Sequence, residues 1–383
     1  MRQAAIYLVV VAVCLLVGVG CVTLTSTGVY TEVARKSGNP YHNVERQVLH
    51  GLLGLCLAAV AALVDYRWWI KFWPWLLAVT LGLLGLCFVE GIGQKINGER
   101  RWISLLGLTF QPSEIGKLTG VVVLAAWFGQ FAKKSQTFLY GILFPGLFVG
   151  SLGVLILMEV DMGTTATLAA AAGVMIYLGG ARLRYLVALL LLGSGVVWFM
   201  VSTVEEDKMV RIEAWKNPEA HADGSAYQPL RAKIALENGG LHGRGIGASR
   251  EKRSRLPFAH TDFIFPIIAE ELGLWGSLGV VAAFVTLAVA GFLVALNSED
   301  RVGKLLGCGL ITIICLQAAL NIAVTTSAVP NTGLPLPFIS YGGTSLVIHL
   351  VQIGILVSIF RFGSRGRETR HDWLEREKFT PRI

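Results

Sequence analysis

Charged residues are scarce in this sequence: Asp, Glu, Lys and Arg make up only 15% of its 383 residues. A soluble globular domain carries about 25% charged residues. Hydrophobic residues make up 54% of the chain, and the mean hydropathy is +0.61. This composition excludes a disordered chain and an ordinary soluble enzyme, and it predicts a polytopic membrane protein.

Paired cysteines and nucleotide-binding motifs are also absent. The six cysteines all fall inside apolar runs, and none forms a C-x-x-C pair. Cysteines in such runs behave as small hydrophobic residues, so we expect neither a disulfide framework nor a thiolate metal site. The sequence contains no P-loop, zinc motif or Ser-His-Asp order. An enzyme of this kind would therefore draw its driving force from an activated substrate.

Ten apolar stretches are long enough, or nearly so, to cross a bilayer, which takes about 20 residues as a helix. We expect an all-α polytopic fold with ten transmembrane helices over 4–26, 45–64, 74–92, 114–132, 138–158, 162–181, 184–204, 264–296, 305–328 and 342–361. One transmembrane domain would cover residues 1–361, followed by a cytoplasmic tail over 362–383. The first stretch exceeds the core of a cleaved signal peptide, about 7–15 residues, so we expect a retained anchor.

The distribution of basic residues predicts the orientation in the membrane. Ten spans place both termini on one side, and ten Lys and Arg residues lie in one long loop, 205–262. Long loops translocate largely regardless of charge. Without that loop, 16 basic residues fall on the side of the termini and 7 on the other. We therefore expect cytoplasmic termini and a large extracytoplasmic loop between the seventh and eighth spans.

This loop is expected to hold short interfacial helices rather than a soluble domain. Apolar residues near helical spacing predict a helix over 228–238, ended by Gly239. Five basic residues follow in the segment 244–255, among them Arg244, Arg250, Lys252 and Arg253. They either form a solvated, headgroup-touching surface or attract an anionic lipid or diphosphate.

Acidic residues mark the point where the chain re-enters the membrane. The segment LPFAHTDFIFPIIAEELG contains Asp262, Glu270 and Glu271. Ionisable groups at membrane depth are functional candidates by default, although Asp262 is also a good helix N-cap. Glu270 and Glu271 are more typical of structural partners for a basic residue. His260 is either a reactive group or a turn residue that hydrogen-bonds locally.

A second polar cluster precedes the fourth span. Glu114 and Lys117 are three residues apart, so they share one helix face. They either form an internal ion pair or leave Lys117 pointing at a phosphate. Arg101 beside Trp102 is either an interfacial anchor or a phosphate clamp.

Two further segments carry polar residues between spans. Asp161 precedes the sixth span, where an N-cap is the simplest interpretation. The segment 331–345, which includes Ser340 and Tyr341, is dense in Pro and Gly. Irregular backbone at membrane depth must line protein or a wet cavity, so we expect this segment to form a cavity wall.

Together, the segments NGERRWI and QPSEIGKL, EVDMGTT, LPFAHTDFIFPIIAEELG and PNTGLPLPFISYGGTSL resemble the SEDS (shape, elongation, division and sporulation) family of bacterial membrane proteins. The similarity covers all ten spans, and PLPFISYGG leans toward the division and sporulation branch. Three positions depart from the family pattern, which often has Ala at Glu99, Pro at Val160 and an acid at Phe258. Phe258 puts in doubt a second carboxylate upstream of Asp262, and Val160 puts in doubt the usual shape of the Asp161 loop.

The resemblance implies a peptidoglycan glycosyltransferase of the bacterial cytoplasmic membrane, which polymerises lipid II and works with a class B penicillin-binding protein and other division or elongation proteins. It implies Asp262 as general base and the basic groups as holders of the departing diphosphate, where a divalent cation, Mg²⁺ or Mn²⁺, would also fit. The expected substrate-binding residues are Arg101, Trp102, Glu114, Lys117, His260, Ser340 and Tyr341. Two alternatives stay open: a lipid II flippase, and a non-catalytic scaffold that activates the penicillin-binding protein.

Overall fold

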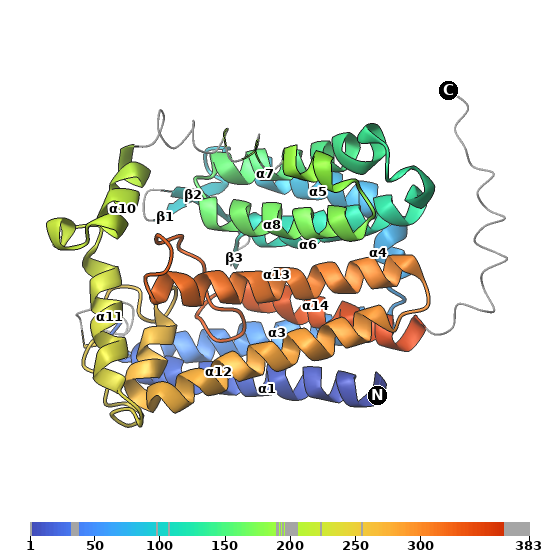
Figure 1. Cartoon of the computed structure of the whole chain (residues 1–383). Coiled ribbons are helices and arrows are strands. Elements are labelled where there is room, and N and C mark those ends of the chain that lie inside the picture. Colours follow the sequence, from blue (N-terminus) through green and yellow to red (C-terminus); the bar gives the residue numbers. More distant parts are fainter. Residues whose placement is uncertain are drawn as a thin grey trace.

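The computed structural model describes residues 2–31, 38–96, 99–105, 108–188, 191, 193, 195, 206–222, 224–253 and 256–363. Its long helices lie side by side as a bundle (Figure 1). They are α1 (Arg2–Gly28), α3 (His42–Leu63), α5 (Trp73–Leu86), α6 (Pro112–Gln130), α7 (Phe144–Met158), α8 (Met162–Leu178), α12 (Ile264–Leu296), α13 (Arg301–Thr325) and α14 (Gly343–Phe362). Short helices α4 (Arg67–Lys71) and η1 (Ala132–Lys134) occupy connections, whereas η2 (Leu139–Leu143) runs directly into α7.

These helices confirm the predicted all-α polytopic fold. Nine of the ten predicted spans coincide with a helix to within six residues at either end. Among the described residues, six helices are long and apolar enough to cross a membrane by themselves, counting η2 and α7 as one continuous span over 139–158. α5 and α8 are shorter apolar helices. Most of the seventh predicted span, 184–204, and the tail beyond residue 363 lie outside the described residues.

A small antiparallel sheet between α5 and α6 was not predicted. It consists of β1 (Gly93–Ile96), β2 (Glu99–Leu105) and β3 (Leu108–Phe110), in the order β1-β2-β3. Ile96 pairs with Glu99, and the dipeptide between them in the sequence is Asn-Gly, which is typical of two-residue hairpin connections. The sheet holds Arg101 and Trp102 on a defined strand instead of a loose loop.

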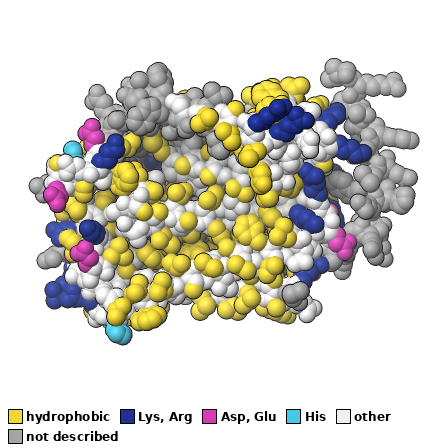
Figure 2. Space-filling model, in the orientation of Figure 1, with side chains coloured by type: hydrophobic (Ala, Val, Ile, Leu, Met, Phe, Trp, Pro, Cys, Tyr) yellow, Lys and Arg dark blue, Asp and Glu magenta, His cyan; other side chains and the backbone are white. Residues whose placement is uncertain are grey.

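Two hydrophobic cores lie on either side of α13 and α14. One packs α5, α6, α7 and α8 together, and the other packs α1 and α12. α13 serves both, because Leu306 and Leu310 face the first core whereas Ile311 and Ile314 face the second. Many large apolar side chains of α1, α3 and α12 remain exposed, and Figure 2 shows hydrophobic side chains spread across the middle of the molecule. Such a surface suits lipid contact and belongs to a multi-pass membrane protein.

The two ends of the bundle differ. At one end, α1 begins and α14 finishes, and the Arg2 guanidinium donates to the carbonyl oxygen of Phe360. At the other end lie the sheet and the loop helices α10 (Glu206–Lys216), η3 (Glu219–His221) and α11 (Tyr227–Gly239) (Figure 1). α11 confirms the helix predicted over 228–238, with Gly240 (φ 54°) just beyond its end.

The eighth span is broken near the loop end. α12 contains non-helical backbone at Gly273, with φ 69° and ψ −165°. The chain that follows α11 fills this break: the Leu274 amide donates to Gly240 O at 2.9 Å, and the Gly245 amide donates to Glu271 O at 3.0 Å. The segment of α12 before Gly273 is therefore fixed by the large loop, next to residues 256–263.

Candidate active site

The four motif segments meet at the loop end of the bundle. The Tyr341 amide donates to His260 O at 2.9 Å, which joins the α13–α14 loop to the segment before α12. The Gln111 amide donates to the Thr344 hydroxyl at 3.1 Å, and the Gln111 side chain donates to Asp161 Oδ2 at 3.1 Å. Sequence regions up to about 230 residues apart thus form one polar surface.

Asp262 stands at the centre of this convergence and is partly exposed. The sequence allowed Asp262 to be the N-cap of α12. In the structure the N-cap residue is Phe263, so Asp262 lies one residue before the cap position. A methyl group placed on Gly333 would lie 3.7 Å from Asp262 Oδ2. The carboxylate therefore faces the backbone of the α13–α14 loop at its glycine, where φ is +69°.

His260, Ser340 and Tyr341 join the two loops around Asp262. The Ser340 hydroxyl donates to Thr261 O at 2.6 Å and accepts from the Leu336 amide at 2.8 Å, so it is committed to the protein. The rings of His260 and Tyr341 lie 5.9 Å apart. Burial lowers the pKa of His260, and burial raises the pKa of Tyr341 despite the opposing effect of Arg46. Both side chains are therefore neutral near pH 7 and add no charge next to Asp262.

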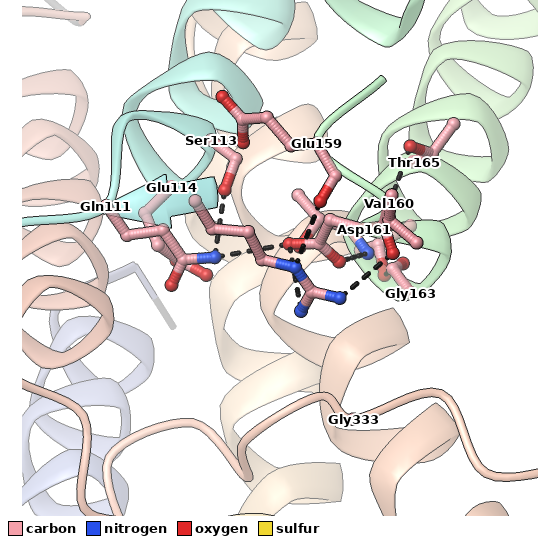
Figure 3. A network of polar contacts seen from close by, with 12 residues as sticks. Gln111, Ser113, Glu114, Glu159, Val160, Asp161, Gly163, Thr165 and Gly333 are labelled. Carbon is pink, nitrogen blue, oxygen red and sulfur yellow. Dashed lines mark hydrogen bonds and ion pairs between the residues drawn. The ribbon is translucent and has the colours of Figure 1, made fainter. Parts of the chain in front are cut away.

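Arg101 clamps the loop between α7 and α8. Its Nη2 donates to Val160 O at 2.9 Å, its Nε donates to Glu159 O at 3.3 Å, and its Nη1 lies 3.9 Å from Asp161 Oδ2. Figure 3 shows Gln111, Glu159, Val160 and Asp161 gathered in this network. Trp102 is half-buried beside Arg101 and pairs with Gln94 of β1. With a side chain 16% exposed, Arg101 shapes the loop and offers little free charge.

Asp161 caps α8, as its position predicted. Its Oδ1 accepts from the Thr164 amide at 3.0 Å, and its Oδ2 accepts from the Thr164 hydroxyl at 2.9 Å. Val160 just before it has φ 64°, a conformation that a proline, fixed near −65°, could not adopt. The loop in this chain therefore differs in backbone shape from one that carries proline at this position.

Glu159 is a buried acid that the sequence did not distinguish. Neither of its carboxylate oxygens finds a hydrogen-bond partner among the described residues. Burial raises the pKa of Glu159 to about 8; Asp161 adds to the rise, whereas the Cys87 thiol and Arg101 oppose it. The carboxyl group is therefore mainly protonated at neutral pH.

Glu114 and Lys117 form an internal ion pair, which is one of the two arrangements that the sequence allowed. Lys117 Nζ lies 2.8 Å from Glu114 Oε1 and also donates to Gln317 Oε1. The Lys117 side chain is 0% exposed. A direct contact between Lys117 and a phosphate, which stays a prediction, would require this pair to open.

The basic segment 244–255 is only partly a free surface. Lys252 differs from expectation, because its ammonium is buried 2.5 Å from Glu271 Oε1. This contact bears out the structural role expected for Glu271. Glu270 accepts from the Ser249 hydroxyl and from the Arg250 amide at 3.0 Å. The guanidinium groups of Arg250 and Arg253 remain exposed, and Arg244 is partly exposed.

Two residues of α3 belong to the site but were overlooked in the sequence. The Gln47 side chain donates to Ser340 O at 3.0 Å and accepts from the Gly342 amide at 3.3 Å. Arg46 beside it is exposed, and within the described part of the chain its guanidinium makes no hydrogen bond or ion pair. The available signal was Arg46 itself, a charge inside the predicted span 45–64, where ionisable groups are functional candidates.

The described residues contain no group of three His, Cys, Asp or Glu side chains that could hold a metal ion. A divalent cation of the expected kind would therefore not find a complete ligand set on this part of the protein. Asp262 could supply one oxygen, and the other ligands would have to come from a diphosphate and water.

Comparison with known proteins finds similarity over most of the chain. The family of cell cycle proteins FtsW, RodA and SpoVE matches residues 6–365. Among similar proteins, the probable peptidoglycan glycosyltransferase FtsW of Geobacter sulfurreducens is 37% identical over 326 residues, 85% of this chain and 87% of that protein. The protein of the same name from Methylomonas methanica is 35% identical over 354 residues, 91% of this chain and 90% of that protein.

Solved structures are similar over nearly the whole chain. A chain from a peptidoglycan synthase complex that coordinates polymerization and crosslinking matches with a TM-score of 0.75 and 26% identity, covering 93% of this chain and 97% of that chain. The rod shape determining protein RodA of Thermus thermophilus has a TM-score of 0.67 at 24% identity, over 92% of this chain and 96% of its own, which is a likeness in fold.

Proposed function

The chain belongs to the FtsW/RodA/SpoVE family of cell cycle proteins, and from this premise we propose that it is a peptidoglycan glycosyltransferase that polymerises lipid II with Asp262 as general base. The observation that supports this most directly is the position of Asp262. Its partly exposed carboxylate lies where four segments converge, beside Gly333, at the end of the bundle opposite the start of α1.

The chemistry requires few groups. A sugar hydroxyl of one substrate attacks the anomeric carbon of the other and forms the new glycosidic bond. The bond from that carbon to the lipid diphosphate breaks, and the undecaprenyl diphosphate leaves with the electron pair. Asp262 takes the hydroxyl proton, and a positioned general base is worth roughly 10²–10⁴-fold in rate.

Positive groups must stabilise the diphosphate as its charge develops. Lys117 and Lys252 are paired with carboxylates inside the protein, and Arg101 is largely engaged by the Asp161 loop. Arg46 has no such partner in the described chain and lies close enough to influence Tyr341. We therefore assign Arg46 the first contact with the diphosphate, with Arg244, Arg250 and Arg253 as further contacts from the large loop.

The proposed setting is the bacterial cytoplasmic membrane, with both termini in the cytoplasm and the site at the outer face. Exposed apolar side chains on α3, such as Leu49 and Leu53, continue from Arg46 along the helix. A lipid tail could follow this face while its diphosphate stays at Arg46. The proposed partner is a class B penicillin-binding protein that cross-links the product; this is supported by the solved neighbour that comes from a peptidoglycan synthase complex in which polymerization and crosslinking are coordinated.

Transport of lipid II is a second candidate, because the Glu114–Lys117 pair and Gln317 place polar groups deep among the helices. Purified protein would be supplied with lipid II in detergent and, separately, in liposomes that report lipid translocation. The glycosyltransferase account predicts glycan polymers in both settings, alone or with a penicillin-binding protein whose cross-linking is blocked. Translocation without polymer would support the flippase, and no product in any setting would support the scaffold.

A further inference from the structure

Two buried amides on α13 face the loop that carries Gly333. Gln317 and Asn321 are four residues apart, so they share one face of the helix. Their exposed fractions are 0% and 1%. Amide groups are costly to bury unless they are hydrogen-bonded, so the partners of these two side chains indicate what they do.

Gln317 links the buried ion pair to the α13–α14 loop. Its Nε2 donates to Pro335 O at 3.0 Å, while its Oε1 accepts from Lys117 Nζ. Because an ammonium group only donates hydrogen bonds, Lys117 fixes which end of the amide faces the loop. The Glu114 carboxylate holds Lys117 in turn, at 2.8 Å.

Asn321 joins the same loop to the backbone of Asp262. Its Nδ2 donates to Leu334 O at 2.7 Å and to Asp262 O at 2.8 Å. Both amide protons are thus used, one on the loop next to Gly333 and the other on the backbone of Asp262. The loop sequence Gly-Leu-Pro-Leu-Pro has two residues without an amide proton, so its carbonyls depend on partners from elsewhere.

We infer that Gln317 and Asn321 are positioning residues that hold the 331–342 loop and the Asp262 backbone in register, and that Lys117 acts on the reaction through Gln317. This inference rests on the proposed role of Asp262. In this arrangement Lys117 acts while its ion pair with Glu114 stays closed. The two amides of α13 contact the backbone of the loop and of Asp262, and they do not contact the substrate.

The sharpest test uses changes that remove the hydrogen bonds from these two amides to the loop. Gln317→Glu keeps an acceptor for Lys117 but loses the donor to Pro335, and Asn321→Leu loses both donors at similar volume. Because a displacement of about 1 Å can reduce a rate about 100-fold, we expect kcat to fall roughly 10-fold for Gln317→Glu and roughly 100-fold for Asn321→Leu. KM for lipid II should stay within about threefold, since neither side chain touches substrate.

A matched control is Thr312→Val, which removes another buried polar group of α13, a hydroxyl that donates to Cys308 O of its own helix and not to the loop. Rates are normalised to monodisperse protein, and thermal unfolding is measured for each variant. Normal kcat in folded Gln317→Glu and Asn321→Leu would overturn the inference, as would an equal loss of kcat in Thr312→Val. If Asn321→Leu does not fold, Gln317→Glu alone decides the outcome.

Lys117 provides an independent test through a double-mutant cycle. If Lys117 acts through Gln317, the loss of kcat in the double variant Lys117→Met with Gln317→Glu should be no larger than the greater single loss. A direct phosphate contact instead predicts a raised KM for Lys117→Met that multiplies with the Gln317→Glu effect. Asp262→Asn is measured alongside: activity in that variant would overturn the proposed base, whereas inactive Asp262→Asn with normal amide variants would overturn only this inference.

Discussion

At the scale of single residues, the basic side chains around Asp262 fall into two classes. Some are already paired with a carboxylate inside the protein, and others are exposed to a substrate. Lys117 and Lys252 are buried against Glu114 and Glu271. A buried cation whose partner holds it at hydrogen-bond distance is expensive to redirect, because breaking the pair leaves an uncompensated charge. An exposed guanidinium such as that of Arg46 can meet a diphosphate without that penalty.

Arg46 therefore has a specific expected phenotype. Arg46→Gln should raise KM for lipid II about 10-fold and lower kcat less, because the contact exists in both the bound and the reacting complex. The measurement is the initial polymerisation rate against lipid II concentration. Lys233→Gln, at an exposed position on α11, is the control, and an unchanged KM in Arg46→Gln would remove Arg46 from the site.

Glu159 should make stability depend on pH. Its pKa is about 8 in the folded protein against 4.5 as the ordinary value. The native state thus holds a proton that the unfolded chain has released between these pH values, so stability falls as pH rises from about 4.5 to 8, by at most about 1.4 kcal/mol per unit. Above about pH 8 the contribution levels off.

Glu159→Gln should remove this dependence. The variant is expected to match the wild type in melting temperature near pH 5 and to exceed it at pH 8. Glu90→Gln, which changes a carboxylate that is 90% exposed, should follow the wild-type curve. The same slope in wild type and Glu159→Gln would show that another group titrates.

Residue roles were predictable from the sequence where a charge or a cap position signalled them. The cap at Asp161 and the structural pairing of Glu271 follow from position and residue type. Gln317 and Asn321 gave no such signal, because a neutral amide inside an apolar run does not reveal which loop it will face. The commitment of Ser340 to Thr261 depends on a fold contact between residues 79 positions apart, which local pattern does not encode.

At the scale of elements, the packing of α8 against the α13–α14 loop sets the shape of the site. A methyl group on Gly163 would lie 2.7 Å from Thr332 O and 2.7 Å from Leu334 Cγ, in the residues that precede and follow Gly333. An alanine methyl group cannot keep contacts this short, so the loop would have to move. That movement would displace Gly333, which faces Asp262.

A pair of alanine substitutions in α8 tests this coupling. Gly163→Ala should lower kcat by roughly 10- to 100-fold through displacement of the loop. Gly173→Ala, where nothing lies within 4 Å of the added methyl group, should keep wild-type kcat and gain up to about 1 kcal/mol in stability from helix propensity. Equal rates in both variants would mean that the loop tolerates movement.

The helices were predictable because a bilayer requires long apolar runs, and their ends agree with the sequence to a few residues. The sheet over 93–110 was not, since its strands are short and polar and its pairing depends on a turn. The break at Gly273 was also hidden, because the glycine lies within an otherwise continuous apolar run. Its role depends on the close approach of Gly243, whose added methyl group would lie 2.2 Å from Glu271 O.

At the scale of the whole molecule, the account requires the site and the termini to lie on opposite sides of the membrane. Cysteines introduced by Glu237→Cys on α11 and Glu299→Cys between α12 and α13 report on the two ends, both at exposed positions. A membrane-impermeant maleimide applied to spheroplasts should label the first and reach the second only after lysis. The unmodified chain gives the background from its six cysteines, and the reverse pattern would invert the topology.

The most direct measurement is the polymerisation rate of purified Asp262→Asn protein supplied with lipid II. Asparagine keeps the size of the side chain and removes its capacity to accept a proton, so the account predicts a fall in kcat of about 10²–10⁴-fold with little change in KM. Glu90→Gln should polymerise at the wild-type rate under the same conditions. Glycan chains made by folded Asp262→Asn at the wild-type rate would contradict the central claim that this carboxylate is the base.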